Sequence, residues 1–420
     1  MKKGKVVSLE VPLKERIKIF LKTLYIIDRY FGHWEGASFD NIDEIYDRYI
    51  NKIIRANDRQ AMFMAMSELV ASLNNGHSIY FDNVLGSKSL GFSAFYHDKL
   101  QQWVISQSSI AEIRPGDIIN SINKIPIERF YKHLSRHIYG SSDRMKRNNL
   151  FWPIFLPERF NIAFDDSRVV NIIKQNYPSF SNKSDRVNYF KINAEIGYLK
   201  IKDFGTENGI SSEAEAIKAV KDMWDCKSLI IDVRGNEGGA TPLKLIKLLM
   251  DREWKGELFA YRKQDTTKEA IYNIYSGKKP KTYEYVYEKQ RHYKPFAKHY
   301  NGHLFMLANQ YTISAAEDFL IPFKMSKRAL IIGSRTTGST GDTYRIKFDD
   351  IHLIIGAYRC WFPDGSEFEG IGIKPDITIY PSINDLKEGK DTELNKALQL
   401  INEGFINKMR GKSPPFRCRI

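Results

Sequence analysis

Residues 228–239 read Ser-Leu-Ile-Ile-Asp-Val-Arg-Gly-Asn-Glu-Gly-Gly, an apolar run that ends in a glycine-rich loop. The run predicts a buried strand, and the apolar spacing over 243–250 predicts that a helix follows. Glycines at such a junction let backbone amides approach a ligand, and a helix N-terminus adds positive dipole. The loop therefore suits a tight turn, a weak phosphate loop or an oxyanion site. It lacks the lysine of a Walker A motif and the three-glycine spacing of a dinucleotide loop.

Strands and helices alternate on both sides of this stretch. The expected strands cover 196–202, 228–233, 303–308 and 329–332, and the expected helices cover 211–224, 243–250 and 314–324. Ser211 or Ser212 is placed to cap the first of these helices. Such alternation predicts an α/β fold with a largely parallel sheet. An Asn- and Ser-rich linker at 175–188 precedes it, and the Tyr- and Lys-rich segment 262–300 reads as an inserted flap.

The first 145 residues have a different character. Apolar residues at three- and four-residue steps predict a helical unit from 12 to about 73, capped in part by Asp58 and closed by the turn Asn74-Asn75-Gly76. Short strands separated by turns follow, and 127–138 reads as a helix. The stretch Arg-Pro-Gly-Asp-Ile-Ile-Asn-Ser-Ile-Asn-Lys-Ile-Pro-Ile at 114–127 resembles PDZ domains, which bind extended peptide ends. A generic β-hairpin is the alternative.

Length and composition indicate a folded protein of two or three compact units. The chain has 420 residues, 42% hydrophobic and 27% charged, values that exclude a disordered or fibrous chain. The formal net charge is +14, but the basic residues are scattered, which favours a solvated surface over nucleic-acid binding.

Cysteine usage and hydropathy bear on the compartment. Cys226, Cys360 and Cys418 have no CxxC spacing, so we expect free thiols rather than a disulfide scaffold or a structural zinc site. No apolar run is long enough to span a membrane, and no signal peptide is visible. A cytoplasmic protein is expected from the chain as written, or a periplasmic or exported one if a leader was trimmed.

Residues 309–319, Asn-Gln-Tyr-Thr-Ile-Ser-Ala-Ala-Glu-Asp-Phe, place a serine where an expected strand meets an expected helix. Ser314 would lie near free backbone amides, where a hydroxyl nucleophile is both exposed and polarised. Ser314 and Glu317 also fit the S-x-x-E capping box. On spacing alone the cap is the favoured interpretation.

Three further segments carry residues with chemical potential. Residues 333–341 form a loop rich in glycine and hydroxyl groups, which alone reads as an ordinary surface loop. Glu369 precedes a Gly-x-Gly turn in Glu-Gly-Ile-Gly-Ile-Lys-Pro-Asp at 369–376. His77 lies in Asn-Gly-His-Ser at 75–78, where a surface or core role is the more common one for a single histidine.

Taken together and in this order, the five segments resemble the C-terminal processing (tail-specific) serine peptidases. The resemblance runs from the N-terminal helices to Pro375-Asp376. It implies a multi-domain α+β chain: a helical unit at 1–84, a PDZ-like domain at 85–145, a crotonase/ClpP-like α/β catalytic domain at 146–405 and a tail at 406–420. In the best-known branch a lysine follows Thr-Phe-Gly, but here Ser339 stands at that position, which excludes a Ser-Lys dyad there.

The sequence looks instead like the branch that contains the tricorn core and the interphotoreceptor retinoid-binding modules. That likeness implies Ser314 as nucleophile, His77 as base and Glu369 as its support. It also implies an oxyanion hole from the amides of Gly239 and Ala315, with Gly238 as near neighbour. Tricorn has a serine before its histidine, whereas here Gly76 precedes His77 and Ser78 follows it. Ser78 and Ser339 are therefore the candidates for an accessory role.

The resemblance implies hydrolysis of unfolded or flexible polypeptides, with action near their C-termini as one option, and without a metal or organic cofactor. A non-hydrolytic peptide- or ligand-binding module of the same fold is the alternative. Within the PDZ-like segment, Ser-Leu-Gly-Phe at 89–92 is the nearest match to a carboxylate-binding loop. Leu90, Gly91 and Phe92 are therefore expected to line a peptide-end site or to gate the cleft.

Overall fold

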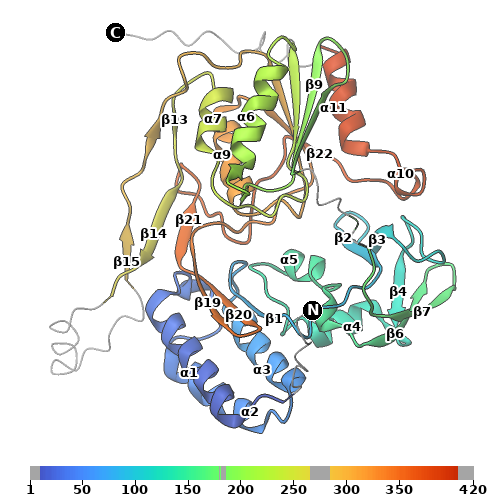
Figure 1. Cartoon of the computed structure of the whole chain (residues 1–420), viewed down its shortest axis with the longest axis vertical. Helices are drawn as coiled ribbons and strands as arrows, with labels where there is room; N and C mark the ends of the chain where they lie inside the picture. Colours follow the sequence, from blue (N-terminus) through green and yellow to red (C-terminus); the bar gives the residue numbers. More distant parts are fainter. Residues whose placement is uncertain (1–9, 179, 181–185, 265–283, 405–420) are drawn as a thin grey trace. The chain divides into compact units, whose positions relative to one another are not determined.

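The structure, a computed structural model, describes residues 10–178, 180, 186–264 and 284–404 (Figure 1). Its backbone contacts divide the chain into two compact units. Unit 1 comprises Met1–Phe180, Glu257–Arg291 and Gly338–Ile371, and unit 2 comprises Ser181–Gly256, His292–Thr337 and Gly372–Ile420. Each unit is thus assembled from segments that are far apart in the sequence. The predicted tail at 406–420 lies outside the described residues.

Unit 2 is built on a six-stranded sheet with the order β22-β18-β17-β12-β9-β8. The strands are β8 (Val187–Lys191), β9 (Ile196–Ile201), β12 (Ser228–Asp232), β17 (His303–Ala308), β18 (Leu330–Gly333) and β22 (Ile377–Thr378). All neighbours are parallel except β8, which pairs antiparallel with β9. The predicted α/β unit with a largely parallel sheet is therefore confirmed.

Helices cover both faces of this sheet. The helices are α6 (Ser212–Asp222), α7 (Leu243–Leu249), α9 (Ala315–Ser326), α10 (Ile383–Lys387) and α11 (Thr392–Asn402). Ile230, Phe305 and Ile332 pack against Ala397 and Leu400 of α11. Because side chains alternate along a strand, the intervening residues face the opposite side, where α6, α7 and α9 lie (Figure 1). Two short antiparallel pairs complete the unit: β10 (Thr206–Glu207) with β11 (Ile210–Ser211), and β13 (Trp254–Lys255) with β16 (His292–Tyr293).

Unit 1 begins with the predicted helices, α1 (Leu13–Tyr30), α2 (Ile42–Arg55) and α3 (Arg59–Ala71). Asp58 caps α3, since its carboxylate accepts the N–H of Ala61 at 2.7 Å. These helices pack on a sheet of β1 (Ile79–Asp82), β20 (Ile351–Gly356) and β19 (Thr343–Phe348), two strands of which come from late in the chain. A further sheet joins β14 (Leu258–Arg262), β15 (Tyr285–Tyr287) and β21 (Tyr358–Trp361), so part of the predicted flap is a strand pair, and 265–283 lies outside the described residues.

The predicted PDZ-like segment contains two sheets. Strands β2 (Phe92–His97) and β3 (Gln102–Ser108) form one, and β5 (Ile125–Pro126), β4 (Ile119–Ile122), β6 (Arg159–Phe164) and β7 (Val169–Ile173) form the other. Helices α4 (Ile127–Leu134) and α5 (Asp143–Asn148) lie between β5 and β6 of the second sheet. Because β4 pairs with β6, this sheet extends beyond the expected boundary at 145.

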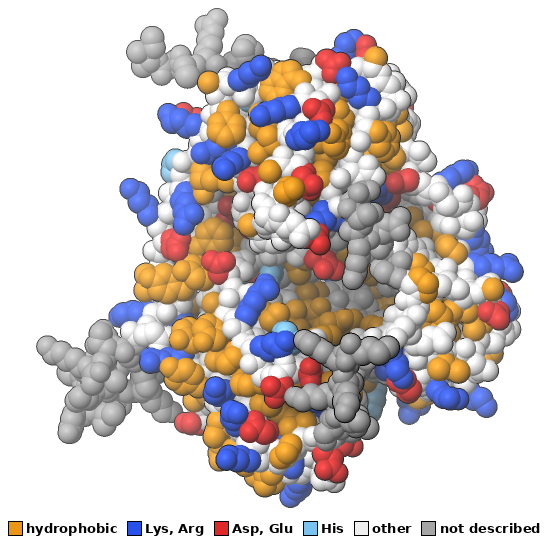
Figure 2. Space-filling model, viewed as in Figure 1, with side chains coloured by type: hydrophobic (Ala, Val, Ile, Leu, Met, Phe, Trp, Pro, Cys, Tyr) orange, Lys and Arg blue, Asp and Glu red, His pale blue; other side chains and the backbone are white. Residues whose placement is uncertain are grey.

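Surface charge, cysteines, membrane-spanning helices and groups of metal ligands were each examined in the described residues. Lys and Arg side chains lie among acidic and hydrophobic ones over the face shown in Figure 2. Among the described residues, Cys226 and Cys360 are buried and form no disulfide, and Cys418 lies outside the described residues. In the described part of the chain, no helix has the length and apolarity needed to cross a bilayer, and no three His, Cys, Asp or Glu side chains are grouped as metal ligands.

Candidate active site

Ser314 lies in unit 2 at the start of α9, in a backbone conformation that serine rarely adopts. Strand β17 ends at Ala308, and residues 309–313 lead directly into the helix. The φ and ψ angles of Ser314 are 62° and −132°. Glycine is the usual occupant of this region, and holding another residue there costs on the order of 1–3 kcal/mol. The surrounding contacts must offset that cost.

The turn before Ser314 is fastened to the neighbouring strand β12 and its loop. The hydroxyl of Thr312 donates to the carbonyl oxygen of Val233 at 2.8 Å. The N–H of Ile313 donates to the carbonyl oxygen of Asn236 at 3.0 Å. Both bonds reach across to the loop after β12, so the position of Ser314 is fixed relative to that loop.

Glu317 holds the start of α9 from the other side. Its fully buried carboxylate accepts the N–H of Ser314 at 3.3 Å, so the predicted pairing of these two residues at the helix start is present. The other carboxylate oxygen accepts the hydroxyl of Thr336, which in turn accepts the N–H of Ile373 at 2.7 Å. The loop after β18 is thereby tied to the helix that carries Ser314.

The loop after β12 brings its glycines against Ser314. A Cβ added to Gly238 would lie 2.6 Å from Ser314 Cβ and 3.1 Å from Ala315 N, so only glycine fits. The N–H of Gly238 is engaged within the loop, because it donates to Asn236 Oδ1 at 2.8 Å. Among the described residues, the N–H groups of Gly239 and Ala315 have no hydrogen-bond acceptor. Two free amides therefore accompany the serine, while Gly238 shapes the loop.

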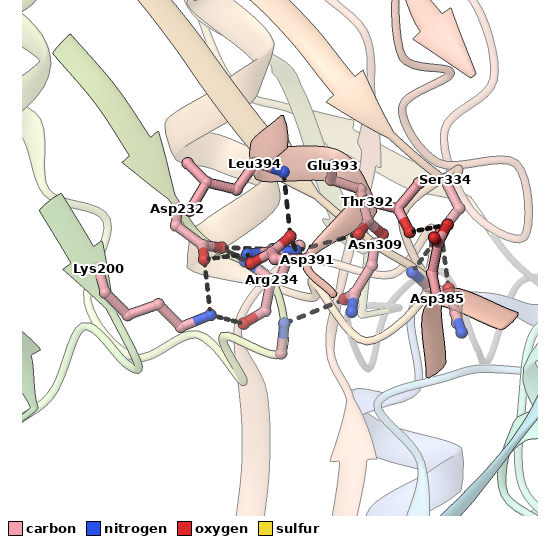
Figure 3. Close-up of polar contacts among 12 residues, drawn as sticks. Lys200, Asp232, Arg234, Asn309, Ser334, Asp385, Asp391, Thr392, Glu393 and Leu394 are labelled. Carbon is pink, nitrogen blue, oxygen red and sulfur yellow. Dashed lines mark hydrogen bonds and ion pairs between the residues drawn. The ribbon is translucent and has the colours of Figure 1, made fainter. Parts of the chain in front are cut away.

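An ion cluster anchors the same loop (Figure 3). The Arg234 guanidinium donates to both carboxylate oxygens of Asp232 at 3.0 and 2.7 Å, and to both of Asp391 at 2.7 Å. Glu393 accepts a further N–H at 3.1 Å, and Lys200 pairs with Asp232 at 3.0 Å. Burial opposes ionisation of Asp232, but the charges of Arg234 and Lys200 outweigh it and hold the pKa of Asp232 at about 2. Strand β12 is thus tied to the N-terminus of α11.

The other predicted residues, His77, Ser339 and Glu369, lie together in unit 1. His77 Nδ1 is 2.7 Å from Ser339 Oγ, and Ser339 Oγ is 2.9 Å from Glu369 Oε1. An ionised carboxylate only accepts, so the Ser339 hydroxyl donates to Glu369 and its oxygen accepts the N–H on His77 Nδ1. His77 Nε2 then carries the free lone pair. Ser339 therefore bridges His77 and Glu369.

The turn at 74–78 is built around the same carboxylate. The N–H of Gly76 and the side-chain amide of Asn75 donate to Glu369 Oε1 at 3.1 and 3.0 Å. A Cβ on Gly76 would lie 2.7 Å from Ser339 Oγ, so a larger residue there would displace the bridge. The Ser78 hydroxyl donates to Asn75 Oδ1 at 2.8 Å and accepts a backbone N–H of β20 at 3.1 Å. Ser78 thus supports the turn, whereas Ser339 contacts His77.

Burial shifts the pKa of both ionisable groups in this cluster. Burial lowers the pKa of His77 to about 4, with a smaller effect from the positive charge of Arg345. Burial raises the pKa of Glu369 to about 7, although the N–H of Gly76 and the Ser339 hydroxyl oppose it. Near neutral pH the imidazole is therefore neutral, as a general base must be, and the carboxyl lies close to its titration point.

The expected peptide-end residues, Leu90, Gly91 and Phe92, lie at the start of β2. The side chains of Leu90 and Phe92 are buried, and a Cβ on Gly91 would lie 2.8 Å from the ring of Tyr177. Asn148 of α5 accepts an N–H of β2 at 3.0 Å. These side chains belong to the core in this structure, and contact with a peptide end would require them to move.

Sequence reasoning did not identify Asn75, Arg234, Asn236 or Thr336 as parts of the site. Arg234 directly precedes the first glycine of the loop and Asn236 follows it, so polar residues next to the glycines were the available signal. The roles of Asn75 and Thr336 depend on partners that are far away in the sequence, so no local pattern could reveal them.

A strained serine beside two free amides, and a histidine linked to a carboxylate, are the groups that serine hydrolases use. Residues 195–379 match Peptidase family S41, which confirms the resemblance inferred from the motifs. The matched segment contains Ser314, the glycine loop, Ser339 and Glu369, whereas His77 precedes it.

Curated relatives share part of their length with this chain. A probable CtpA-like serine protease of Staphylococcus aureus (strain COL) is 26% identical over 240 residues, 54% of this chain and 44% of the relative. Tricorn protease of Thermoplasma acidophilum is 24% identical over 246 residues, 58% of this chain and 20% of the relative. The chain thus spans less than half the length of these curated relatives.

Solved structures resemble this one in fold over nearly all of the chain. Mature CPAF complexed with lactacystin has a TM-score of 0.71 and 14% identity, and covers 94% of this chain and 99% of its own. The crystal structure of tricorn protease has a TM-score of 0.51 and 15% identity, covering 93% of this chain and 37% of that one. At such identities the likeness concerns the mixed α/β fold.

Proposed function

We propose that this protein is a serine peptidase that cleaves unfolded or flexible polypeptides, including segments near their C-termini. The observation that carries the proposal is the strained backbone of Ser314 beside the free amides of Gly239 and Ala315. A serine that serves only as a helix cap has no need of a conformation costing on the order of 1–3 kcal/mol. Preorganised amides next to a hydroxyl are what acyl transfer requires.

In this mechanism Ser314 Oγ attacks the scissile carbonyl carbon while His77 Nε2 accepts the hydroxyl proton. The amides of Gly239 and Ala315 stabilise the oxyanion of the tetrahedral intermediate. Collapse expels the amine fragment, which takes the proton from His77, and leaves an acyl-enzyme on Ser314. A water molecule, deprotonated by His77, then releases the second fragment as a carboxylic acid and regenerates the hydroxyl.

Ser339 and Glu369 assist His77 without contacting the reacting atoms. The hydrogen bond from His77 Nδ1 to Ser339 fixes the tautomer that leaves Nε2 free, and the Glu369 charge stabilises the imidazolium through Ser339. Ser339 takes this bridging position from the loop after β18, whereas the branch resemblance offered a serine next to the histidine. The arrangement supports Ser339 as the fourth member of a catalytic tetrad.

The finer layout of the chain belongs to the same proposal. Strands β2–β7 with α4 would form the PDZ-like peptide-binding part, and the parallel sheet of unit 2 a crotonase/ClpP-like catalytic part. The β2–β3 and β4–β6 pairings are compatible with the former, and the helix-covered parallel sheet is compatible with the latter.

Replacement of Ser314 by alanine tests the proposal. Ser314→Ala should abolish both peptide hydrolysis and fluorophosphonate labelling, while the unfolding transition is retained. Ser326→Ala is the matched control, because Ser326 ends the same helix and its hydroxyl bonds the carbonyl oxygen of Pro322 and the sulfur of Met250. Labelling or hydrolysis that persists in Ser314→Ala would refute the proposed nucleophile. Wild-type protein that binds peptides of a library but cleaves none would establish the non-hydrolytic alternative.

A further inference from the structure

Unit 1 contains a pocket of about 280 Å³ next to the His77 cluster, formed by the end of α4, the segment 140–142 and the start of α5. Two cationic side chains, Arg136 and Lys146, line it together with Asn74, Ser141, Ser142 and Asp143. Lys146 is half-buried, and burial lowers its pKa, although the charge of Asp143 opposes this. The pocket thus combines positive charge with partial exclusion of water.

Asp143, the acidic residue among those that line the pocket, already interacts with two other side chains. Asp143 accepts the Arg147 guanidinium at 2.6 Å and the Tyr131 hydroxyl at 2.5 Å. In the described parts of the chain, Lys146 makes no ion pair, and its ammonium donates to Asn74 Oδ1 at 3.2 Å. Arg136 donates its Nε–H to a ring nitrogen of His137 at 3.0 Å and likewise pairs with no carboxylate of the described chain.

A half-buried cation without a counter-ion is unfavourable, because desolvation is not offset by a charge–charge attraction. An anion in the pocket would supply that attraction. Hydrogen bonds between an ionised donor and an ionised acceptor are also stronger than neutral ones. The charge balance of the pocket therefore favours an anionic ligand, and a carboxylate matches its small polar lining.

Two contacts link the pocket to the catalytic residues of the same unit. Lys146 bonds Asn74, which lies three residues before His77. The Ser141 hydroxyl bonds the carbonyl oxygen of Gly338, the residue before Ser339, at 3.3 Å. The pocket is therefore joined by these two hydrogen bonds to the segments that carry His77 and Ser339.

We infer that this pocket binds a carboxylate of the substrate, with Lys146 as the principal cation and Arg136 at its rim. The inference rests on the proposed peptidase function and adds a specificity-determining subsite to it. A carboxylate can come from the C-terminus of the substrate or from an acidic side chain. The chemistry recognised is the same in both cases, so the test must separate the two sources.

Three peptides of one sequence, otherwise free of acidic residues, separate them: a free C-terminal acid, its C-terminal amide, and the amide with one internal glutamate. We expect wild-type kcat/KM to be at least tenfold higher for one of the carboxylate peptides than for the neutral amide, mainly through KM. A charged hydrogen bond worth about 1.5 kcal/mol or more gives a factor of that size. The preferred peptide identifies the source.

Lys146→Met should cost the preferred carboxylate peptide at least tenfold more in kcat/KM than it costs the neutral amide. Arg136→Met, at an exposed position, should reduce the same preference in part. Lys132→Met on the exposed face of α4 removes an equal charge outside the pocket and should leave the preference intact. Equal cleavage of all three peptides by wild type, or a preference that survives Lys146→Met, would overturn the inference.

Binding to Ser314→Ala distinguishes this failure from failure of the proposed function. Fluorescence anisotropy with the same three peptides needs no turnover. Suppose that wild type hydrolyses none of the peptides, but Ser314→Ala binds a carboxylate peptide at least tenfold more tightly than the amide, and that this preference requires Lys146. The peptidase proposal would then be refuted, whereas the carboxylate pocket would be supported. Equal binding of the three peptides refutes the pocket alone.

Discussion

At Glu369, the stability of the fold and the proposed catalytic role favour opposite states of charge. Its carboxyl accepts three hydrogen bonds, from Asn75, Gly76 and Ser339, yet its pKa is raised from 4.5 to about 7 because burial dominates. Between pH 4.5 and 7 the unfolded chain has lost this proton while the folded chain retains it. The free energy of unfolding therefore falls as the pH rises through that window, and at pH 8 the cost is about 3 kcal/mol.

We predict that Glu369→Gln raises Tm at pH 8 and that the gain shrinks at pH 5, where folded Glu369 is protonated. The glutamine oxygen keeps the acceptor but removes the buried charge. Activity should fall on the order of 100-fold or more, because the imidazolium loses its stabilising charge. Thermal unfolding at both pH values, with peptide hydrolysis, measures the two effects.

The matched control is Glu367→Gln, which removes an exposed carboxylate two residues away. An exposed ion pair contributes little, so Tm should stay close to that of wild type. In wild type we also expect kcat/KM to rise with pH around 7, as Glu369 ionises, while His77 is already neutral above pH 4. A Glu369→Gln protein that is less stable than wild type at pH 8 would contradict this account.

At the scale of elements, two glycines of the loop after β12 allow a test of whether this loop positions Ser314. Gly235 and Gly238 both have positive φ angles, 70° and 92°, so alanine is strained at either position. Only Gly238 faces an obstacle, with Ser314 Cβ 2.6 Å from the position of an added Cβ, whereas an added Cβ on Gly235 meets open space. The two substitutions therefore differ in whether the added Cβ clashes with Ser314, the proposed nucleophile.

We predict that Gly235→Ala costs about 1 kcal/mol of stability and keeps most activity. Gly238→Ala should pay the same strain and also lose more than 100-fold in kcat, because it displaces Ser314 from its free amides. Steady-state kinetics and chemical denaturation of both variants measure this. Comparable kcat values in the two variants would show that the loop does not position Ser314.

The sequence predicted helices, strands and caps correctly where their signal lies within a few neighbouring residues. The strand at 303–308 and the cap Asp58 were placed correctly because an apolar run and an Asp before a helix act within a few residues. The pairing of β1 with β20, and of β14 with β21, could not be predicted, because nothing in either strand identifies a partner so far along the chain.

The candidate site divides in the same way. The motifs proposed Ser314, His77 and Glu369 as site residues, but the position of Ser339 between His77 and Glu369 required the fold of unit 1. The cluster of Arg234, Asp391 and Lys200 likewise joins residues more than 150 positions apart. Tertiary proximity of this kind leaves no trace in a single sequence.

At the scale of the whole molecule, basic and acidic residues are interspersed along the sequence. The net charge of +14 comes from basic residues that lie among acidic ones over the face seen in Figure 2, and many are paired, as Arg234 and Arg147 are. Sequence-independent binding of nucleic acid needs several cations along one path, each releasing a counter-ion.

We therefore predict weak retention on double-stranded DNA, with elution below about 150 mM salt and a shallow dependence of affinity on salt. Titration of labelled duplex DNA at several salt concentrations measures the slope. A nucleic-acid-binding protein of similar net charge serves as the reference. A steep slope, equivalent to six or more released ions, would contradict the prediction and revive the nucleic-acid interpretation.

The backbone of Ser314 has a consequence for protein engineering. Glycine is the residue that φ 62° and ψ −132° suit, so the hydroxyl of the proposed nucleophile is held at a position whose backbone conformation is unfavourable for serine. If Ser314 is the nucleophile, as proposed, a library selected only for folding or heat resistance would collect glycine at position 314 and thereby enrich inactive proteins. A selection for stabilised variants of this chain must therefore measure peptide hydrolysis and thermal stability in the same round.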